Sequence, residues 1–570
     1  MNERILLVVI VLAFGGGMTA AAPDAQRTYR NEVKQARRSE KGFWEGFKRA
    51  YNRAYLAFRQ PLENARTDPV TFKEAVQDFS KFDEIYGEYA AIEAARGNAA
   101  ITWAMSGGPR ALPSLFKEML ALAPKIDRLD RELLEARPSD SRFAFDQRPG
   151  VLRHGLHVLE KKLVEALGAA HGAAAFLAGD GWESASRKDG RKSIRRRVAV
   201  IDALGALPRP ARDEAARKRL ASLITAPASS LRVAAVEALA RWGADEAPLL
   251  HDALADPSPI VRRVALEAAR GPAKNPSWIS PVLDGSTHPA RARSRDHLVT
   301  LETLTRQKFG YDAAAWREWF GEYRKEIESG KFKVEETEVQ DVKPRPATDE
   351  IRFFGVPTLG RGIVFIVDGG VVLEIPTDVK YKRSRYFYEW YGWNPSWKKQ
   401  YPSQQMVLLD QLGLTFSNWT PESRFGLIIL HQNFNLTILG EKKLLGSRRA
   451  DFKAAHDKID KLRAAPRRWC SQYAGILGAM SIGGLDPGSD THFKNPKIDT
   501  IYLWNRGLPR GGRYMSAAAV VSAFKRLNRF RRVVVHSIRV GDAKEAAEQV
   551  MKGIADASGG TYVWVQKAPK

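Results

Sequence analysis

The chain has 570 residues, of which 44% are hydrophobic and 27% charged, and its formal net charge is +25. This length is too great for a single hydrophobic core, so we expect two to four domains. The positive charge favours anionic partners, such as an envelope polyanion, a lipid headgroup or an acidic protein. Because Cys470 is the only cysteine, an intramolecular disulfide and a thiolate metal site are both excluded.

Residues 1–21 resemble a secretory signal peptide. Arg4 precedes an apolar run from Ile5 to Phe14, and small residues then lead to a cleavage position after Ala21. The alternative is a membrane anchor, but the run is shorter than the roughly 20 residues that a spanning helix needs. We therefore expect an exported protein, periplasmic or extracellular, with no membrane span after cleavage. Export argues against a nucleic-acid partner.

A helical pattern extends over residues 26–190. Apolar residues recur at spacings of three and four in residues 116–136 and 151–178, which predicts antiparallel helices and leaves a coiled-coil hairpin as one option. His154, His157 and Glu160 follow one another at steps of three. A metal site on helices normally takes ligands from a second helix, and no matching pattern occurs, so structural roles are favoured.

Residues 193–330 contain a weak internal repeat. The segments RRRVAVIDALGAL, SLRVAAVEALARWG and IVRRVALEAARG place Val198, Val233 and Val264 in matching positions. Such repeats predict stacked helical pairs that share one core, and the unit resembles the HEAT repeat. Trp316 and Trp319, three apart on a later helix, are interpreted as a cap for the array, with a ligand-binding aromatic pair as the weaker alternative. Residues 333–350 are charged, contain proline and are predicted to be a linker.

Strands and helices alternate in residues 351–570. This alternation predicts a mostly parallel, doubly wound α/β sheet with helices on both faces, following an all-α N-terminal half. We expect strands at residues 363–368, 425–431, 434–439, 498–504, 532–541 and 561–565, and helices at residues 405–414, 516–528 and 545–560. The first of these strands delivers Asp368 to its carboxyl end, where open α/β sheets bind ligands.

Three segments of this half resemble a von Willebrand factor type A (VWA) domain. GRGIVFIVD resembles its first strand, IDTIYLWNRGLPRGG its fourth, and SIRVG with IADASGGTYVWV its closing elements. Many members bind a divalent cation at a metal-ion-dependent adhesion site. The resemblance implies ligands from an Asp-x-Ser-x-Ser loop, a second loop with Thr, and the Asp of a Ser-Asp-Gly loop.

The ligand positions of that site are largely substituted here. Asp368 is retained, but Gly370 and Val372 replace the two serines, Cys470 stands at the threonine position and Arg506 replaces the second carboxylate. We therefore predict a degenerate site with no metal and no cofactor. Our hypothesis is that Asp368 pairs with Arg506, so that a side chain takes the place of the cation. The alternative is that Asp368 caps a loop or a helix start.

An insertion rich in aromatic and basic residues follows the first ligand loop, at residues 380–402. Such a composition suits a protein interface, or stacking on sugars or bases. The equally weighted alternative is that the rings cover the sheet or dock on the helical repeats. The candidate ligand-face residues are Tyr386, Tyr388, Trp390, Trp393, Trp397, Arg383 and Arg385.

Together these features indicate a noncatalytic scaffold or binding protein that uses helical repeats and a metal-free VWA-like domain to bind a protein or an anionic envelope polymer. One alternative is a cation-dependent adhesin with nonstandard ligands such as Glu374 or Asp378. Another is a binder of an envelope polymer, or an enzyme acting on it. We expect no enzyme, because no nucleophile elbow, His-Glu-x-x-His helix or P-loop occurs.

Overall fold

The computed structural model describes most of the chain outside its N-terminus and the loops of the C-terminal half. The described residues are 22–64, 80–135, 148–186, 190–286, 291–310, 312–334, 352–358, 360, 362–368, 404–417, 424–430, 436–441, 443–446, 449–460, 472–480, 497–505, 516–540 and 545–565. The predicted signal peptide and the aromatic insertion lie outside them.

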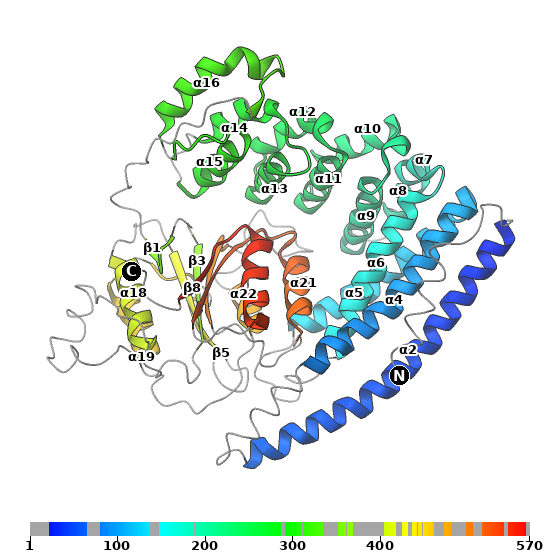
Figure 1. Cartoon of the computed structure of the whole chain (residues 1–570), viewed down its shortest axis with the longest axis horizontal. Coiled ribbons are helices and arrows are strands. Elements are labelled where there is room, and N and C mark those ends of the chain that lie inside the picture. Colours follow the sequence, from blue (N-terminus) through cyan, green and yellow to red (C-terminus); the bar gives the residue numbers. More distant parts are fainter. Residues whose placement is uncertain are drawn as a thin grey trace.

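The N-terminal half is helical, as predicted, and its helices form an arch (Figure 1). Tyr29 stacks on Trp103 with ring centroids 4.7 Å apart, joining the first helix to the second. The helices are α2 (Ala22–Asn64), α4 (Ser80–Gly107), α5 (Leu112–Glu135), α6 (Arg148–Ala169), α7 (Ala173–Phe176), α8 (Trp182–Ser186), α9 (Gly190–Gly205), α10 (Glu214–Leu223), α11 (Ser229–Trp242), α12 (Ala247–Leu250), α13 (Pro259–Arg270), α14 (Ile279–Ser286), α15 (Arg291–Thr305) and α16 (Ala313–Glu328).

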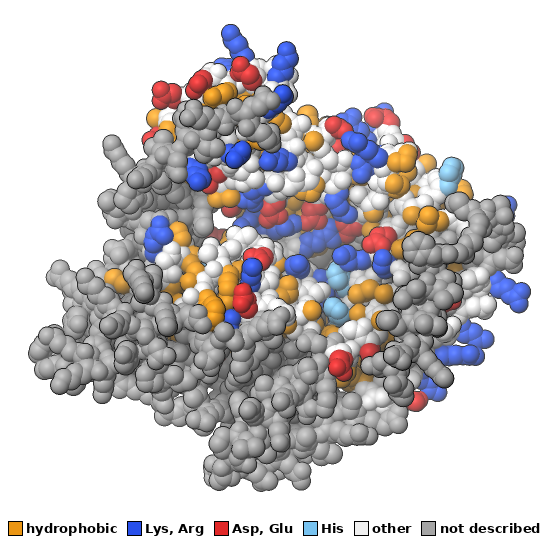
Figure 2. All heavy atoms as spheres, viewed as in Figure 1, with side chains coloured by type: hydrophobic (Ala, Val, Ile, Leu, Met, Phe, Trp, Pro, Cys, Tyr) orange, Lys and Arg blue, Asp and Glu red, His pale blue; other side chains and the backbone are white. Residues whose placement is uncertain are grey.

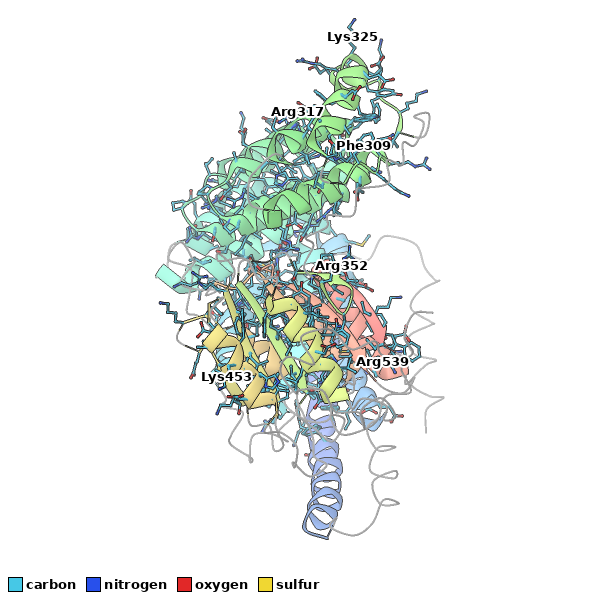
Figure 3. The ribbon with its side chains drawn as sticks, turned by 90° about the vertical axis from the view of Figure 1, so that its left-hand side faces the viewer. Phe309, Arg317, Lys325, Arg352, Lys453 and Arg539 are labelled. Carbon is cyan, nitrogen blue, oxygen red and sulfur yellow. The ribbon has the colours of Figure 1, made fainter. Side chains whose placement is uncertain are left out.

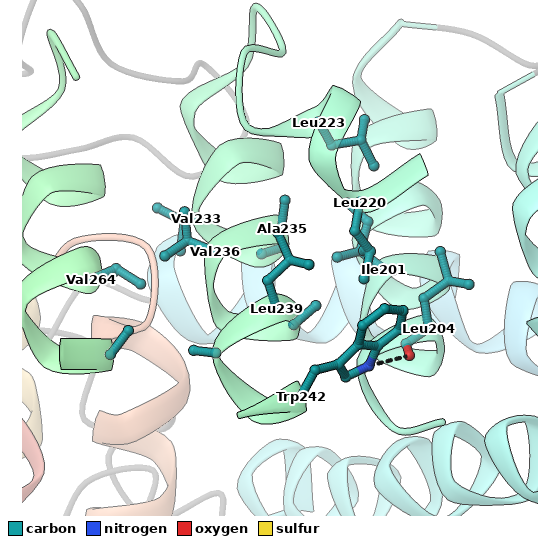
Figure 4. Packing of buried hydrophobic residues seen from close by; sticks show 14 of the residues in the cluster. Ile201, Leu204, Leu220, Leu223, Val233, Ala235, Val236, Leu239, Trp242 and Val264 are labelled. Carbon is teal, nitrogen blue, oxygen red and sulfur yellow. Dashed lines mark hydrogen bonds between the residues drawn. The ribbon is translucent and has the colours of Figure 1, made fainter. Parts of the chain in front are cut away.

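The three segments of the internal repeat fold as the neighbouring helices α9, α11 and α13. Val198, Val233 and Val264 are buried in one continuous core. Figure 4 shows this packing, in which the indole Nε1 of Trp242 donates to the carbonyl of Leu204 at 3.1 Å. The hydrogen bond ties the end of α11 to α9. Stacking therefore buries the apolar face that each repeat carries.

The aromatic residues at the far end of the array are part of its core. Trp316 and Trp319 are 0% and 2% exposed. Trp316 meets Phe309 edge to face, with centroids 4.9 Å apart, and its Nε1 donates to the Gly310 carbonyl at 3.0 Å. Burial of both indoles favours packing over the alternative of a ligand-binding pair.

The C-terminal half contains the predicted sheet, and its six strands and the helices near residues 405–414, 516–528 and 545–560 fall where the sequence places them. A helix at residues 449–460 and a short strand pair at residues 352–357 were not predicted. The six strands run in the order β5-β4-β3-β6-β7-β8, with all neighbours parallel except β4 and β5. The bounds are β1 (Arg352–Phe353), β2 (Val356–Pro357), β3 (Gly362–Asp368), α18 (Gln404–Ser417), β4 (Arg424–Leu430), β5 (Leu436–Leu439), α19 (Arg449–Asp460), α20 (Gln472–Ala479), β6 (Thr500–Asn505), α21 (Ala517–Asn528), β7 (Val534–Val540), α22 (Glu545–Ser558) and β8 (Tyr562–Val565); β1 and β2 form a separate antiparallel pair.

Alternate residues of the central strand enter two different cores. Val364 and Ile366 pack with α20, α21 and α22, whereas Phe365 and Val367 pack with α18 and α19. A strand buried on both faces explains the continuous apolar run that precedes Asp368. The doubly wound α/β fold class is therefore confirmed.

The α/β half sits inside the helical arch, with α21 facing α4 and α6 (Figure 1). Tyr86, Leu133 and Val151 of the bundle belong to the same hydrophobic cluster as Phe524 and Leu527 of α21. The inner side of the arch thus contacts the chain's own C-terminal half. A repeat array suggests a concave surface that binds a partner. Along this contact, the chain's own C-terminal half occupies that surface.

Candidate functional site

Asp368 ends β3 at the carboxyl edge of the sheet and is 8% exposed. It lies in register with Leu430 of β4, while the preceding Val367 pairs with Trp504 of β6. The chain continues in opposite directions across the sheet from β3, because β4 and β5 lie on one side and β6, β7 and β8 on the other. This is the topological switch point at which doubly wound sheets bind their ligands.

A row of buried polar residues crosses this edge. Asn505, which follows Trp504, is 2% exposed and pairs in register with Arg539 of β7, which is fully buried. The Arg539 guanidinium lies over the Trp564 ring, 4.9 Å from its centroid, and its Nη1 is 3.4 Å from the Tyr562 hydroxyl. Arg539 did not emerge from the sequence patterns, although an arginine within a predicted central strand was a signal for it.

The remaining predicted site residues are not among the described residues, so the Asp368–Arg506 pairing and the ligand face of the insertion stay predictions. Within the described part of the chain, no group of three or more His, Cys, Asp or Glu side chains is placed to hold a metal ion. The predicted residues that lie outside it are Gly370, Val372, Cys470 and Arg506, with Arg383, Arg385, Tyr386, Tyr388, Trp390, Trp393 and Trp397 of the insertion.

A second candidate site lies where the arch meets the α/β half. Arg529, just after α21, forms a two-pronged ion pair with Asp202 of α9, with Nη1–Oδ2 and Nη2–Oδ1 distances of 2.8 and 2.6 Å. Its Nε also donates to Glu237 of α11 at 2.9 Å. One guanidinium therefore bridges two repeat helices.

Arg532 continues this contact along the arch. Its Nη1 donates to Glu267 of α13 at 2.5 Å, and its Nη2 donates to Glu237. In return, the Nη1 of Arg263 donates to the carbonyl of Arg532 at 2.8 Å. We call Arg529, Arg532, Asp202, Glu237 and Glu267 the arginine clamp.

The geometry of the clamp follows from the repeat. Each acid comes after a buried aliphatic residue and before an alanine, in Ile201-Asp202-Ala203, Val236-Glu237-Ala238 and Leu266-Glu267-Ala268. The three neighbouring helices therefore each carry a carboxylate that contacts the α21–β7 turn, which inserts two guanidiniums between them. Asn528 fixes this turn by hydrogen bonds of 2.8 Å to the N–H and C=O of Val533.

The clamp charges stabilise one another. Burial alone would raise the pKa of Asp202, but the Arg529 guanidinium outweighs this effect, and the pKa is lowered. Burial likewise opposes the charge of Arg529, yet its two carboxylate partners hold its pKa well above the ordinary value. Both groups thus remain ionised across the physiological range, as bidentate guanidinium–carboxylate pairs do.

A second charged cluster lies at the bundle end of the same interface. Asp130 of α5 accepts hydrogen bonds at 2.6 Å from Arg153 of α6 and from Arg195 of α9. Burial would raise the pKa of Asp130, but these two guanidiniums outweigh it and lower the pKa to about 2.

The two histidines of α6 stand beside this cluster. His157 lies 3.8 Å from Glu160, and the His154 ring meets Tyr86 edge to face at 5.8 Å. Burial lowers the pKa of both, that of His154 to about 4, and nearby Arg526 adds to the effect. Both imidazoles are therefore neutral at physiological pH. These environments agree with the structural roles expected of them.

Between the clamp and the bundle-end cluster lies a cavity of about 1110 Å³. Figure 2 shows blue and red side chains gathered in the hollow between the repeat helices and the α/β half. Nine Lys or Arg and seven Asp or Glu residues line the cavity, which leaves a formal excess of two positive charges. No sequence pattern indicates this cavity, because its walls come from elements far apart in the chain, namely α5, α6, α9, α11, α13, α20 and α21.

Comparison with known proteins assigns no family. No protein-family model matches the chain, and no curated protein matches it. Among the helices that the structure describes, none combines the length and apolar character needed to cross a membrane.

Proposed function

We propose that the chain is a noncatalytic, exported scaffold that binds a protein or an anionic envelope polymer through a metal-free, VWA-like α/β domain held in a helical arch. The arginine clamp carries this proposal. Its two guanidiniums engage three successive repeat helices, and a shared hydrophobic core continues the contact. A scaffold needs its binding faces in fixed relative positions, and the clamp supplies this fixation.

The binding face of this scaffold is the carboxyl edge of the sheet together with the insertion at residues 380–402, which follows Asp368 in the sequence. Asp368 marks the edge at the topological switch point. The insertion follows Asp368 in the chain and supplies rigid aromatic and basic side chains, which are the residue types that dominate interface energetics. The excess positive charge of the chain favours an anionic partner.

The experiment is co-sedimentation of the full-length mature protein with isolated envelope polymer, in buffer containing EDTA. The variant Arg383→Gln/Arg385→Gln should weaken binding about tenfold or more, as should Trp390→Ala, because hot-spot side chains each contribute about 2 kcal/mol or more. The charge-matched control is Arg317→Gln/Arg324→Gln on α16, where both side chains are exposed. This control should bind as the parent does.

Equal binding by all variants would overturn the assignment of the insertion as the binding face. Loss of binding in EDTA that magnesium or calcium restores would instead favour the cation-dependent alternative. Consumption of the polymer, measured as released fragments, would show an enzyme.

A further inference from the structure

The cavity between the arch and the α/β half contains guanidinium groups that no carboxylate neutralises. Arg196 of α9 and Arg531 of the α21–β7 turn both line it. Among the described residues, neither forms an ion pair with an acid. The Nη1 of Arg531 donates to the Leu527 carbonyl at 2.5 Å, and the buried Nε of Arg196 has no hydrogen-bond partner.

The acidic residues of the cavity are already committed to other groups. Asp130 is shared by Arg153 and Arg195, and Asp202, Glu237 and Glu267 belong to the arginine clamp. Glu165 pairs with Lys162 at 2.9 Å. Asp127 pairs with Arg195, and Glu160 lies beside His157. None of the seven lining carboxylates therefore forms an ion pair with Arg196 or Arg531.

Holding these two guanidinium groups in the cavity without an anion destabilises the folded protein. Burial disfavours the charged form of Arg531 and lowers its pKa to about 10, even though Asp130 and Tyr473 act in the opposite direction. A buried N–H group without a hydrogen-bond partner, such as the Arg196 Nε, also destabilises the folded state, because it has lost its contact with water. Both costs are removed by an anion that accepts hydrogen bonds from the two side chains.

We propose that this cavity is a binding site for a small phosphorylated anion, with Arg531 and Arg196 as its principal cationic contacts. A phosphomonoester carries about −1.5 to −2 charges at neutral pH, which matches the excess of two. The planar guanidinium fork fits phosphate oxygens. The volume is sufficient, because small-molecule sites typically occupy about 300 to 1,000 Å³.

This site is distinct from the binding face of the proposed scaffold. It uses α9 and the α21–β7 turn, whereas the binding face uses the carboxyl edge of the sheet and residues 380–402. Failure of one proposal therefore leaves the other standing, and the two can be separated by variants that touch only one site.

The test is isothermal titration of the full-length mature protein with sodium pyrophosphate, at an ionic strength held constant with chloride. We expect saturable binding of one pyrophosphate per chain, weakened at least about tenfold in Arg531→Gln and in Arg196→Gln, which corresponds to about 1.4 kcal/mol. The matched control is Arg317→Gln, which removes the same charge from α16, a helix that contributes no residue to the cavity lining; Figure 3 labels Arg317 on this helix. Its affinity should stay within about twofold of the parent's, because a distant exposed charge is screened.

Thermal melts of the cavity variants and a titration with succinate test the proposal further. Without ligand, both cavity variants should melt at or above the temperature of the parent protein, because each removes an uncompensated cation; a lower melting temperature would reassign these arginines as structural. Titration with succinate tests the chemical class, since a dicarboxylate that binds as tightly as pyrophosphate would overturn the assignment to phosphate. Absence of saturable heat with pyrophosphate, or equal weakening by Arg317→Gln, would overturn the site itself.

Discussion

Arg529 and Asp202 are 327 positions apart in the sequence, yet they form a two-pronged ion pair with N–O distances of 2.6 and 2.8 Å. Their side chains are 28% and 18% exposed, so the pair is partly shielded from water. Arg529 also donates to Glu237. The contact between the arch and the α/β half therefore contains ion pairs of defined geometry in addition to hydrophobic packing. The relative position of the two halves is thus specified by charge and not by apolar contact alone.

Substitution of Arg529 by methionine should destabilise the protein by about 2 to 4 kcal/mol. The reason is that it leaves two partly buried carboxylates, Asp202 and Glu237, without this cation, and breaking such a pair costs far more than breaking an exposed one. The measurement is the free energy of unfolding in urea. Arg209→Met is the matched control, because the pair of Arg209 with Asp245 is 79% exposed on both sides and should be worth less than about 1 kcal/mol. Equal losses in the two variants would contradict a special role for the clamp.

The α/β fold could be predicted because its signals are local. The five apolar residues from Ile363 to Val367 describe a strand buried on both faces, and the structure places them in two cores. Because such strands alternate with amphipathic helices, only a few sheet topologies are compatible with this half of the chain. The position of Asp368 at the carboxyl end of β3 followed from the same pattern.

The contact between arch and sheet could not be predicted, because Arg529 and Arg532 resemble any solvent-exposed charges of a basic chain. A sign was nevertheless present in the repeat. Asp202 and Glu237 each follow the matching valine of their repeat by four residues, and Glu267 follows Val264 by three. Acids this close to matching positions of stacked helices form a stripe. The cavity depends on this long-range arrangement, so it was hidden for the same reason.

Acidification should weaken the protein through Asp130. Its pKa is lowered from the ordinary value of 3.8 to about 2 in the folded state. The stabilisation is therefore fully present above about pH 4 and is lost as the pH falls toward 2, by about 2 kcal/mol. Urea unfolding from pH 5 to pH 2 should show this loss, and Asp130→Asn should remove it. Asp245→Asn, at an exposed pair, should leave the acid profile unchanged; an identical change in both variants would contradict the role of Asp130.

His154 should add a second pH dependence at higher pH. Burial lowers its pKa from 6.5 to about 4, with Arg526, His157 and Arg153 contributing in the same direction. The unfolded chain therefore binds the proton first, and stability should fall by up to about 3 kcal/mol as the pH drops from 6.5 to 4.

The variant His154→Phe isolates this effect, because phenylalanine keeps the edge-to-face contact with Tyr86 and cannot titrate. Its unfolding free energy should depend less on pH between 6.5 and 4 than that of the parent protein. His171→Gln, at an exposed position after α6, is the control and should follow the parent curve. A parent-like slope in His154→Phe would show that other groups, such as His157, produce the dependence.

Divalent cations should not bind at the carboxyl edge of the sheet. Calcium and magnesium need several oxygen ligands. Of the positions that the resemblance to a VWA domain would make ligands, only Asp368 has a carboxylate, and Gly370 and Val372 supply no side-chain oxygen. Titration of the full-length protein with magnesium, manganese and calcium should give no saturable heat, and EDTA should not change the melting temperature. Arg506→Asp should not restore binding, because the missing hydroxyls are still absent. Stoichiometric heat that Asp368→Asn abolishes would contradict the metal-free site and would direct the search for ligands to Glu374 and Asp378.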